Sequence, residues 1–273
     1  MDTIQQIFLY GSDERQMMLG KLLEQEQVPV TYCNEQHPLP ELSGCQLPPV
    51  DATILLPLPC SDTLYQKVLT GMEPEQLVIG GNLSPVFVEK CNQIGAKVYD
   101  YLKSPSVVIH NAVATAEGAI CEAIAHSPWN LHNSHCLVMG YGRCGSVLAQ
   151  RLAGLGCHVT VSARDIIKIA QAETCGYDIL KPETDLSCFR FLFNTIPASV
   201  VNADMLARLS PDVTIIDIAS APGGCDFAYC RKHEISAYLC PGLPAKYAPK
   251  SSAEIIFRHI HEVFQFGSKG KTL

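Results

Sequence analysis

The chain has 273 residues, of which 47% are apolar, and its formal net charge is −7. That length and apolar share allow a sizeable core, in one large domain or two ordinary ones. Because acidic and basic residues are interspersed rather than gathered in blocks, the charge argues against a surface for nucleic acid or for an anionic membrane.

The N-terminal segment MDTIQQIFLYG has neither a basic region nor a small-residue cleavage site, which argues against a secretory signal peptide. The longest apolar runs, 52–59 and 213–221, are far shorter than a bilayer-spanning helix. We therefore expect a soluble, cytoplasmic protein without a membrane partner.

The 13 cysteines are scattered and no two have the spacing C-x-x-C. Five of them stand in apolar segments, and we interpret these five as small buried apolar residues in a reducing compartment, in preference to disulfides or metal ligands: Cys33, Cys91, Cys136, Cys157 and Cys240. No metal site is expected among the histidines either, because His259 and His261 are two residues apart on a predicted helix and point to different faces.

Short apolar runs alternate with helical patterns along the chain, which predicts an α/β protein with parallel sheets. In the first half we expect strands at 6–11, 28–33, 52–57, 76–81 and 96–102. Helices are expected at 14–26, 62–71 and 85–94. Five strands with intervening helices predict a small doubly wound sheet of the flavodoxin-like type.

An alanine-rich segment, 106–128, predicts a helix between the halves that ends at Pro128. Helical spacing gives it one apolar face, formed by Ala112, Ala116, Ala119, Ala123 and Ile124. We expect an N-terminal domain at 1–108, a hinge helix at 109–128 and a Rossmann domain at 129–249. The amphipathic segment 250–266 predicts a last helix that packs back on the N-terminal domain, which would place the site in a cleft between two α/β domains.

The second half contains a glycine pattern between two apolar runs. Strands are expected at 135–140, 157–163, 189–196, 213–219 and 235–241. The first is followed by Gly140, Tyr141, Gly142, Arg143, Cys144 and Gly145, and then by a helix whose buried face we assign to Val147, Leu148, Leu152 and Leu155, with Gly156 as its terminator. A G-x-G-x-x-G in a strand–helix–strand frame is typical of a dinucleotide site; the alternative is a Rossmann fold that binds no nucleotide.

The end of the second strand of this half discriminates between cofactors. An NAD site places Asp or Glu there to bind the ribose hydroxyls, whereas this chain has Ser162, Ala163 and Arg164. We predict NADP, with Arg164 pairing with the 2′-phosphate; an ordinary surface arginine is the alternative. The far wall of the pocket is expected from two later strand ends, Asn194, Thr195, Ile196 and Pro197 in one, and Asp217, Ala219 and Ser220 in the other.

Eight blocks carry a more specific resemblance: YGSDERQ (10–16), ILLP (54–57), TAEGAI (115–120), GYGRCG (140–145), SAR (162–164), NTIP (194–197), DIASAPGGCDF (217–227) and PGLPAKYAPKSSAEII (241–256). With them the chain resembles the dipicolinate synthase A-chain family over essentially its whole length. The resemblance implies an NADP-dependent dehydrogenase that makes dipicolinate from dihydrodipicolinate or 4-hydroxy-tetrahydrodipicolinate during sporulation. It also implies that the partner is a flavoprotein-like B subunit and that the protein acts in the mother-cell cytoplasm; self-association of the chain stays open.

A dicarboxylate substrate calls for cations. We predict Arg15, at the start of the first helix, as one carboxylate ligand, with pairing to Asp13 or Glu14 as the alternative. Lys246 and Lys250 are further candidates. Glu117, with Thr115 before it, stands on an apolar helix, so a catalytic role for this pair is predicted; Glu117 would be a base or would orient the substrate. A helix–helix contact is the alternative for Glu117, and His110 is a weaker candidate base.

Two rivals remain. D-2-hydroxy-acid dehydrogenases share the layout, but they use an arginine after the fifth Rossmann strand and a histidine before the final helix, and 219–227 and 241–252 contain neither. S-adenosylhomocysteine hydrolase-like proteins need NAD and a longer substrate domain. The other rival is a non-catalytic protein that binds NADP without turnover.

Overall fold

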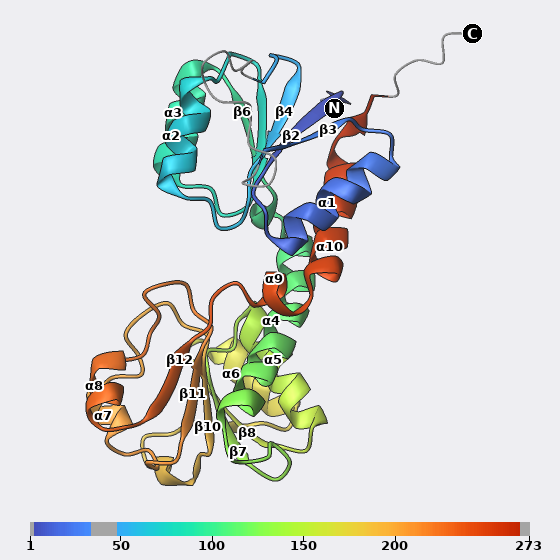
Figure 1. The fold of residues 1–273 in the computed structure, drawn as a ribbon. Coiled ribbons are helices and arrows are strands. Elements are labelled where there is room, and N and C mark those ends of the chain that lie inside the picture. Colours follow the sequence, from blue (N-terminus) through green and yellow to red (C-terminus); the bar gives the residue numbers. More distant parts are fainter. Residues whose placement is uncertain (1–2, 34–47, 268–273) are drawn as a thin grey trace. The chain divides into compact units, whose positions relative to one another are not determined.

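The computed structural model describes residues 3–33 and 48–267 (Figure 1). The chain folds into two compact units: unit 1 comprises Met1–His110 and Ala248–Leu273, and unit 2 comprises Asn111–Tyr247. Each unit contains one large parallel sheet with helices on both faces, so the predicted α/β fold class is confirmed.

Unit 1 has a five-stranded sheet in the order β3-β2-β4-β5-β6, with every pair of neighbours parallel. Its strands are β2 (Gln6–Tyr10), β3 (Val30–Cys33), β4 (Ala52–Leu55), β5 (Leu77–Gly80) and β6 (Lys97–Asp100). Its helices are α1 (Glu14–Gln25), α2 (Asp62–Thr70), α3 (Pro85–Ile94), the short η1 (Tyr101–Lys103) and α10 (Pro249–Val263). This is the predicted flavodoxin-like order, in which the strand sequence reverses between β2 and β4.

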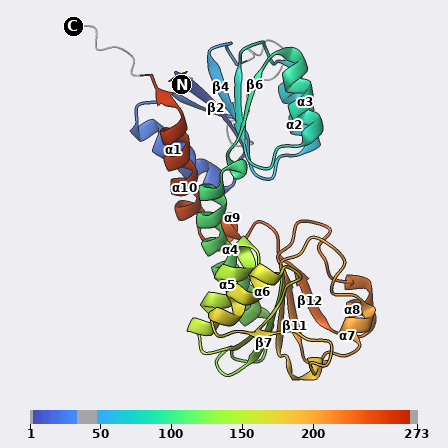
Figure 2. The same cartoon turned by 180° about the vertical axis from the view of Figure 1, so that it is seen from behind.

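The two faces of the unit 1 sheet are covered by different helix pairs (Figure 2). On one face α1 and α10 bury Leu19, Leu23, Ile256 and Ile260 in a common core. The other face is covered by α2 and α3, where the rings of Tyr65 and Phe87 stack with centroids 4.3 Å apart. The last helix therefore packs within unit 1.

The predicted extent of that last helix is wrong at its C-terminal end. The helix ends at Val263, and Gln265–Phe266 form the short strand β13, which pairs in parallel with β1 (Thr3–Ile4). Both strands have only two residues, and the amphipathic pattern continues through 265 and 266, so periodicity alone does not separate them from the helix.

The central helix α4 (Pro105–His126) passes from unit 1 into unit 2. Its alanines behave as predicted and are buried: Ala112, Ala116, Ala119 and Ala123. The assignment of Ile124 to that face is wrong, because 58% of this side chain is exposed. Among the described residues, α4 is also the one helix long and apolar enough to cross a membrane, which the two apolar runs considered in the sequence did not show; half of its most apolar window is buried.

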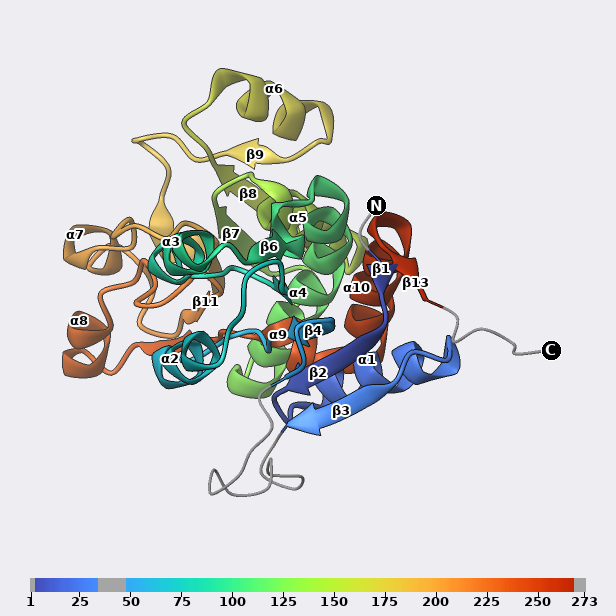
Figure 3. The ribbon, with the colours of Figure 1, turned by 90° about the horizontal axis from the view of Figure 1, so that it is seen from above.

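Unit 2 has a six-stranded parallel sheet in the order β12-β11-β10-β7-β8-β9, which is the Rossmann order. Its strands are β7 (His135–Met139), β8 (His158–Ser162), β9 (Asp178–Ile179), β10 (Phe191–Asn194), β11 (Thr214–Asp217) and β12 (Ser236–Leu239). Its helices, besides α4, are α5 (Arg143–Gly154), α6 (Ile166–Thr174), η2 (Leu186–Cys188), α7 (Ala203–Leu206), α8 (Phe227–Lys232) and α9 (Leu243–Tyr247). Figure 3 shows β9 and α6 beyond β8 at one edge; the sequence did not predict β9, which has two residues.

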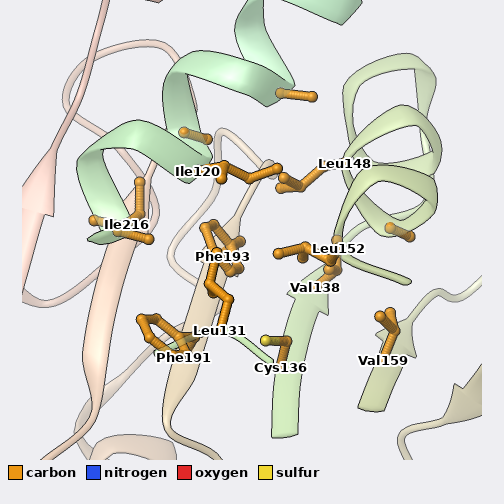
Figure 4. Packing of buried hydrophobic residues seen from close by; sticks show 14 of the residues in the cluster. Ile120, Leu131, Cys136, Val138, Leu148, Leu152, Val159, Phe191, Phe193 and Ile216 are labelled. Atoms are coloured by element: carbon orange, nitrogen blue, oxygen red, sulfur yellow. The ribbon is translucent and has the colours of Figure 1, made fainter. Parts of the chain in front are cut away.

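One of the two core clusters of unit 2 lies between the sheet and α4 and α5 (Figure 4). Leu148 and Leu152 of α5 are fully buried against Val138 and Phe193 of the sheet, and each such side chain contributes roughly 2 kcal/mol. Leu155 was assigned to this face wrongly. It is 46% exposed, because α5 ends at Gly154 and the chain turns at Gly156 (φ 79°) toward β8.

Candidate dinucleotide site

The glycine loop between β7 and α5 has a local reason for each glycine. Gly140 has φ 96°, a backbone conformation that side chains disfavour, and a Cβ there would lie 2.5 Å from Thr195 Oγ1. A Cβ on Gly145 would lie 2.1 Å from the carbonyl oxygen of Gly140, so the helix packs directly on the loop. At Gly142 a Cβ would meet nothing within 4 Å. The loop thus leaves bare backbone at its middle glycine.

The N-terminus of α5 carries no side-chain cap. Gly142 occupies the N-cap position and has no side chain to accept a hydrogen bond from the first turn. The first backbone N–H groups of a helix need acceptors, and the helix dipole favours negative charge at this end. Bare backbone and an uncapped helix together fit a pyrophosphate group, so the residues present match a dinucleotide.

A cavity of about 450 Å³ opens beside the loop at the carboxyl ends of β7, β8 and β10, within the range of small-molecule sites. It is lined by Met139, Gly140, Tyr141, Gly142, Ser162, Ala163, Arg164, Asp165, Lys168, Thr195, Ile196, Pro197 and Val200. Most of the residues predicted from the sequence are thus brought together. The cavity lining does not include the predicted residues Arg143, Cys144, Gly145, Asn194, Asp217, Ala219 and Ser220.

Two charged residues in the lining were missed. Lys168, on α6, is exposed beside Arg164, so two cations face this end of the cavity. Asp165 caps α6, and its Oδ1 accepts the backbone N–H of Ile167 at 2.8 Å. Lys168 could have been predicted from the sequence, because it stands four positions after Arg164, where the next helix begins.

Asn194 has a structural position and does not line the cavity. It is fully buried, and its Nδ2 donates to the Oδ1 of Asp217 at 2.9 Å and to the carbonyl of Ile196 at 3.1 Å. Its Oδ1 accepts the backbone N–H of Ile196 at 3.1 Å. Of the segment 194–197 expected in the pocket wall, Thr195, Ile196 and Pro197 line the cavity and Asn194 does not. It holds Ile196, which lines the cavity.

Asp217 is the acceptor at the centre of this network. It has no exposed surface, and its two oxygens accept four hydrogen bonds, from Asn194 Nδ2 and the backbone N–H groups of Ala219, Gly224 and Cys225, at 2.7 to 3.0 Å. Ala219 is 4% exposed, and its N–H is used by this bond. Every lone pair of the carboxylate thus has a role in shaping the two loops that follow β10 and β11.

Arg15 is buried within unit 1, and the pairing with Asp13 that the sequence offered as an alternative is present, although the arginine is not exposed. Only 3% of it is exposed, and its Nη2 donates to the carbonyl of Leu58. Its Nε lies 3.9 Å from Asp13 Oδ1, beyond hydrogen-bonding distance. Neither this Nε nor Nε2 of the neighbouring Gln16 has a hydrogen-bond partner. Arg15 joins the loops after β2 and β4, which is the point where the strand order reverses.

Glu117 does not meet the premise of a buried carboxylate. Its side chain is 57% exposed, and an oxygen lies 3.8 Å from Nε of Arg151 on α5, so the predicted helix–helix contact is present. The hydroxyl of Thr115 donates to the carbonyl of Asn111 within α4 at 3.0 Å. His110 is likewise bonded within the helix, with Nδ1 2.8 Å from the carbonyl of Ser106. A catalytic role for these residues stays a prediction.

The buried carboxylate of α4 is Glu122, which the sequence did not reveal. Its side chain is 7% exposed and accepts a hydrogen bond from Lys246 Nζ at 2.6 Å, while His126 Nε2 lies 3.4 Å away. Burial acts to raise the pKa of Glu122, but hydrogen bonds from Lys246 and Tyr247 outweigh it and hold the pKa below its ordinary value. Lys246, predicted as a substrate ligand, thus already has a carboxylate partner; its role toward substrate stays a prediction.

Comparisons with known proteins agree with this geometry. The family described as D-isomer specific 2-hydroxyacid dehydrogenase, NAD binding domain, matches residues 92–222. The A chain of dipicolinate synthase from Bacillus subtilis (strain 168) is 34% identical over 189 residues, which are 67% of this chain and 63% of that protein. The chain thus aligns with less than two thirds of this relative's length.

Two solved structures have the same fold. The dipicolinate synthase A chain from Bacillus subtilis superimposes with a TM-score of 0.79 and 26% identity, covering 96% of each chain. The corresponding dipicolinate synthase chain from Bacillus halodurans has a TM-score of 0.82 at 24% identity, covering 96% of this chain and 99% of the other.

The Rossmann sheet, the glycine loop and the matched NAD-binding family define a dehydrogenase-like chain and support a nicotinamide cofactor. Within that class, the resemblance to the dipicolinate synthase A-chain family indicated by the eight sequence blocks is confirmed by the curated relative and by the superimposed structures.

Proposed function

We propose that the chain is the NADP-dependent dehydrogenase component of a dipicolinate synthase. It would oxidise dihydrodipicolinate, or 4-hydroxy-tetrahydrodipicolinate with loss of one water molecule, to dipicolinate, pyridine-2,6-dicarboxylate, in the cytoplasm of the mother cell of a sporulating bacterium. The similarity to the dipicolinate synthase A chain carries this proposal. When bound, the nicotinamide accepts a hydride. Since the product ring is aromatic, the chain's main task is to bind and orient the substrate.

The choice of NADP rests on the charges beside β8. Ser162 and Ala163 line the cavity where an NAD site would carry a carboxylate, and Arg164 and Lys168 are exposed next to them. The nearest acid, Asp165, uses its Oδ1 to cap α6. A 2′-phosphate would meet two cations here, and the guanidinium offers paired donors to its oxygens.

This choice is tested by binding of NADPH and NADH to the full chain, followed by the fluorescence of the bound dinucleotide. A hydrogen bond to a charged group contributes about 1.5–3 kcal/mol, so R164A and K168A should each weaken NADPH binding roughly ten- to hundredfold. NADH binding should change little, and K232A, on the exposed end of α8, should change neither. Equal affinities of the unchanged chain for NADPH and NADH would contradict the proposal.

For a substrate carboxylate we propose Arg15. The Nε of this buried guanidinium has no hydrogen-bond partner and lies at the strand reversal of unit 1, which supports the proposal because ligands of open α/β sheets bind at such points. Calorimetric titration with dipicolinate, the stable product, tests it. We expect R15K to weaken binding roughly tenfold, since the guanidinium's paired donors are lost while the charge is kept. K21M, on the exposed side of α1, is the matched control; an R15K variant that binds like the unchanged chain would exclude Arg15.

The partner is proposed to be the flavoprotein-like B subunit, since the curated relative is named as one subunit of its enzyme. Substrate and NADP are added to the chain with and without that protein, and nicotinamide absorbance is followed. NADPH formed by the chain alone identifies a complete catalyst. Formation only with the B subunit identifies a chain completed by its partner, and no formation in either case contradicts the proposed reaction.

A further inference from the structure

Two cysteines lie in contact at the start of α8. The sulfur atoms of Cys225 and Cys230 are 3.7 Å apart. Asp226 is the N-cap of this helix, and its Oδ1 accepts the backbone N–H of Tyr229 at 2.9 Å. Cys225 therefore precedes the cap and Cys230 is the fourth residue of the helix, the two positions whose side chains regularly pack together at helix starts. Here both positions carry thiols.

The backbone around Cys225 keeps the two sulfurs together. Its N–H donates to Asp217 Oδ2 at 3.0 Å, and Cys225 pairs with Val201 in a parallel bridge. Cys225 is half-buried, whereas Cys230 is 2% exposed. A reagent in solution thus meets Cys225 first, and Cys230 lies behind it.

We propose that Cys225 and Cys230 form a reversible disulfide by exchange with a small disulfide such as oxidised glutathione. Cys225 Sγ releases its proton to solvent and attacks one sulfur of the reagent, whose S–S bond breaks and releases one thiolate. Cys230 Sγ then loses its proton and attacks Cys225 Sγ, and the second thiolate leaves. The two protein thiols are oxidised by two electrons and the reagent is reduced to two thiols.

The geometry asks for little movement. The sulfurs must approach from 3.7 Å to about 2.05 Å, the length of a disulfide bond. The hydrogen bond with Cys230 and burial raise the pKa of the Cys225 thiol. Because the thiolate is the attacking species, the first step should go faster at alkaline pH.

The modified segment borders the candidate dinucleotide site. The carbonyl of Gly224 accepts the backbone N–H groups of Val200 and Val201 at 3.1 and 3.0 Å, and Val200 lines the cavity. Closing the disulfide therefore acts on a segment that is bonded directly to the cavity wall. We therefore expect the oxidation state of Cys225 and Cys230 to affect the cavity wall at Val200.

Peptide mapping tests the proposal on the full, reduced chain. The chain is treated with oxidised glutathione, remaining thiols are blocked with N-ethylmaleimide, and trypsin releases 209–231, whose only cysteines are Cys225 and Cys230. We expect this peptide to carry neither glutathione nor maleimide and to lack two hydrogens. Cleavage after Phe227 or Tyr229 should leave two pieces that separate only on reduction. Two maleimides on this peptide, while the exposed Cys188 carries glutathione, would overturn the proposal.

Single variants separate the two steps. In C230S, glutathione should stay on Cys225, because the closing thiol is absent. In C225S, Cys230 should carry no glutathione while the chain is folded, since it is 2% exposed. Glutathione that stays on Cys225 in the unchanged chain, or that reaches Cys230 in C225S, would refute the order of attack and the closing step.

Discussion

Replacing Asp217 by Asn is the sharpest test of the architecture behind the dinucleotide loop. The carboxylate is completely buried and accepts four hydrogen bonds, two at each oxygen. An amide keeps one acceptor and places an NH₂ group against two donors. If the NH₂ takes the Oδ2 position, the bonds from Gly224 and Cys225 are lost; the other orientation loses those from Asn194 and Ala219.

The magnitude follows from that count. A hydrogen bond to a charged group contributes about 1.5–3 kcal/mol, so the loss of two predicts a destabilisation of about 3–6 kcal/mol. A domain's whole stability is only about 5–15 kcal/mol, so D217N should bring unit 2 close to unfolding. D204N provides the control. Asp204 is exposed on α7, and surface substitutions usually change stability by less than about 0.5 kcal/mol.

Urea unfolding followed by tryptophan fluorescence is the assay. Trp129 is the single tryptophan of the chain and belongs to unit 2, with the guanidinium of Arg190 4.4 Å from its ring centroid, so its emission reports on this unit. We expect the D217N transition at much lower urea with an unchanged slope. A change in unfolding free energy below about 1 kcal/mol would refute the four-bond network.

Two further predictions concern α4 and the glycine loop. E122Q should lower the unfolding free energy by about 1.5–3 kcal/mol near neutral pH, because the charged hydrogen bond to Lys246 is lost. A carboxyl whose pKa is lower in the folded protein than in the unfolded chain stabilises the folded state at pH values above the unfolded pKa, which is ordinarily 4.5. This stabilisation is lost as the pH falls through the lower, folded-state pKa. Thermal melts should therefore differ near neutral pH and converge in acid; a pH-independent difference would contradict this. G145A should unfold or fail to bind dinucleotide, since its Cβ would lie 2.1 Å from the Gly140 carbonyl, whereas G142A should melt like the unchanged chain and bind more weakly. Normal binding by G145A would disprove the close packing of helix on loop.

The parts of the site that the sequence predicted are those with local causes. The glycines and the residues that end β7 and β8 are set by turn geometry within one strand–helix–strand unit. Lys168 was missed because α6 itself was not assigned. Asn194 was misplaced because a polar residue at a strand end faces either the cavity or the adjacent loop, and the sequence does not tell which.

The two carboxylates of α4 show that helical periodicity alone does not predict which charged side chain is buried. Glu117 and Glu122 stand on the same helix, and nothing in their spacing ranks Glu122 above Glu117. Their burial depends on what packs on each side chain. Glu117 has the ion pair with Arg151 of α5 beside it and stays exposed. Glu122 is covered by α9, whose Lys246 lies 124 residues further along the chain. The predicted burial of Ile124 and Leu155 was wrong for the same reason, because an apolar side chain is buried only where a neighbouring element packs against it.

The discontinuity of unit 1 sets the order in which the chain can fold. Unit 2 is one continuous segment, 111–247, so its six strands are all available before α10 has been synthesised. In unit 1, Leu19 and Leu23 of α1 are covered only after Ile256 and Ile260 of α10 have been synthesised. Likewise, β1 can pair only once β13 has been synthesised. Until then the nascent unit 1 exposes an apolar face, whose closure is slowed because the whole of unit 2 lies in the loop to be closed. Protection of α1 from hydrogen exchange should thus develop after that of α5 during synthesis.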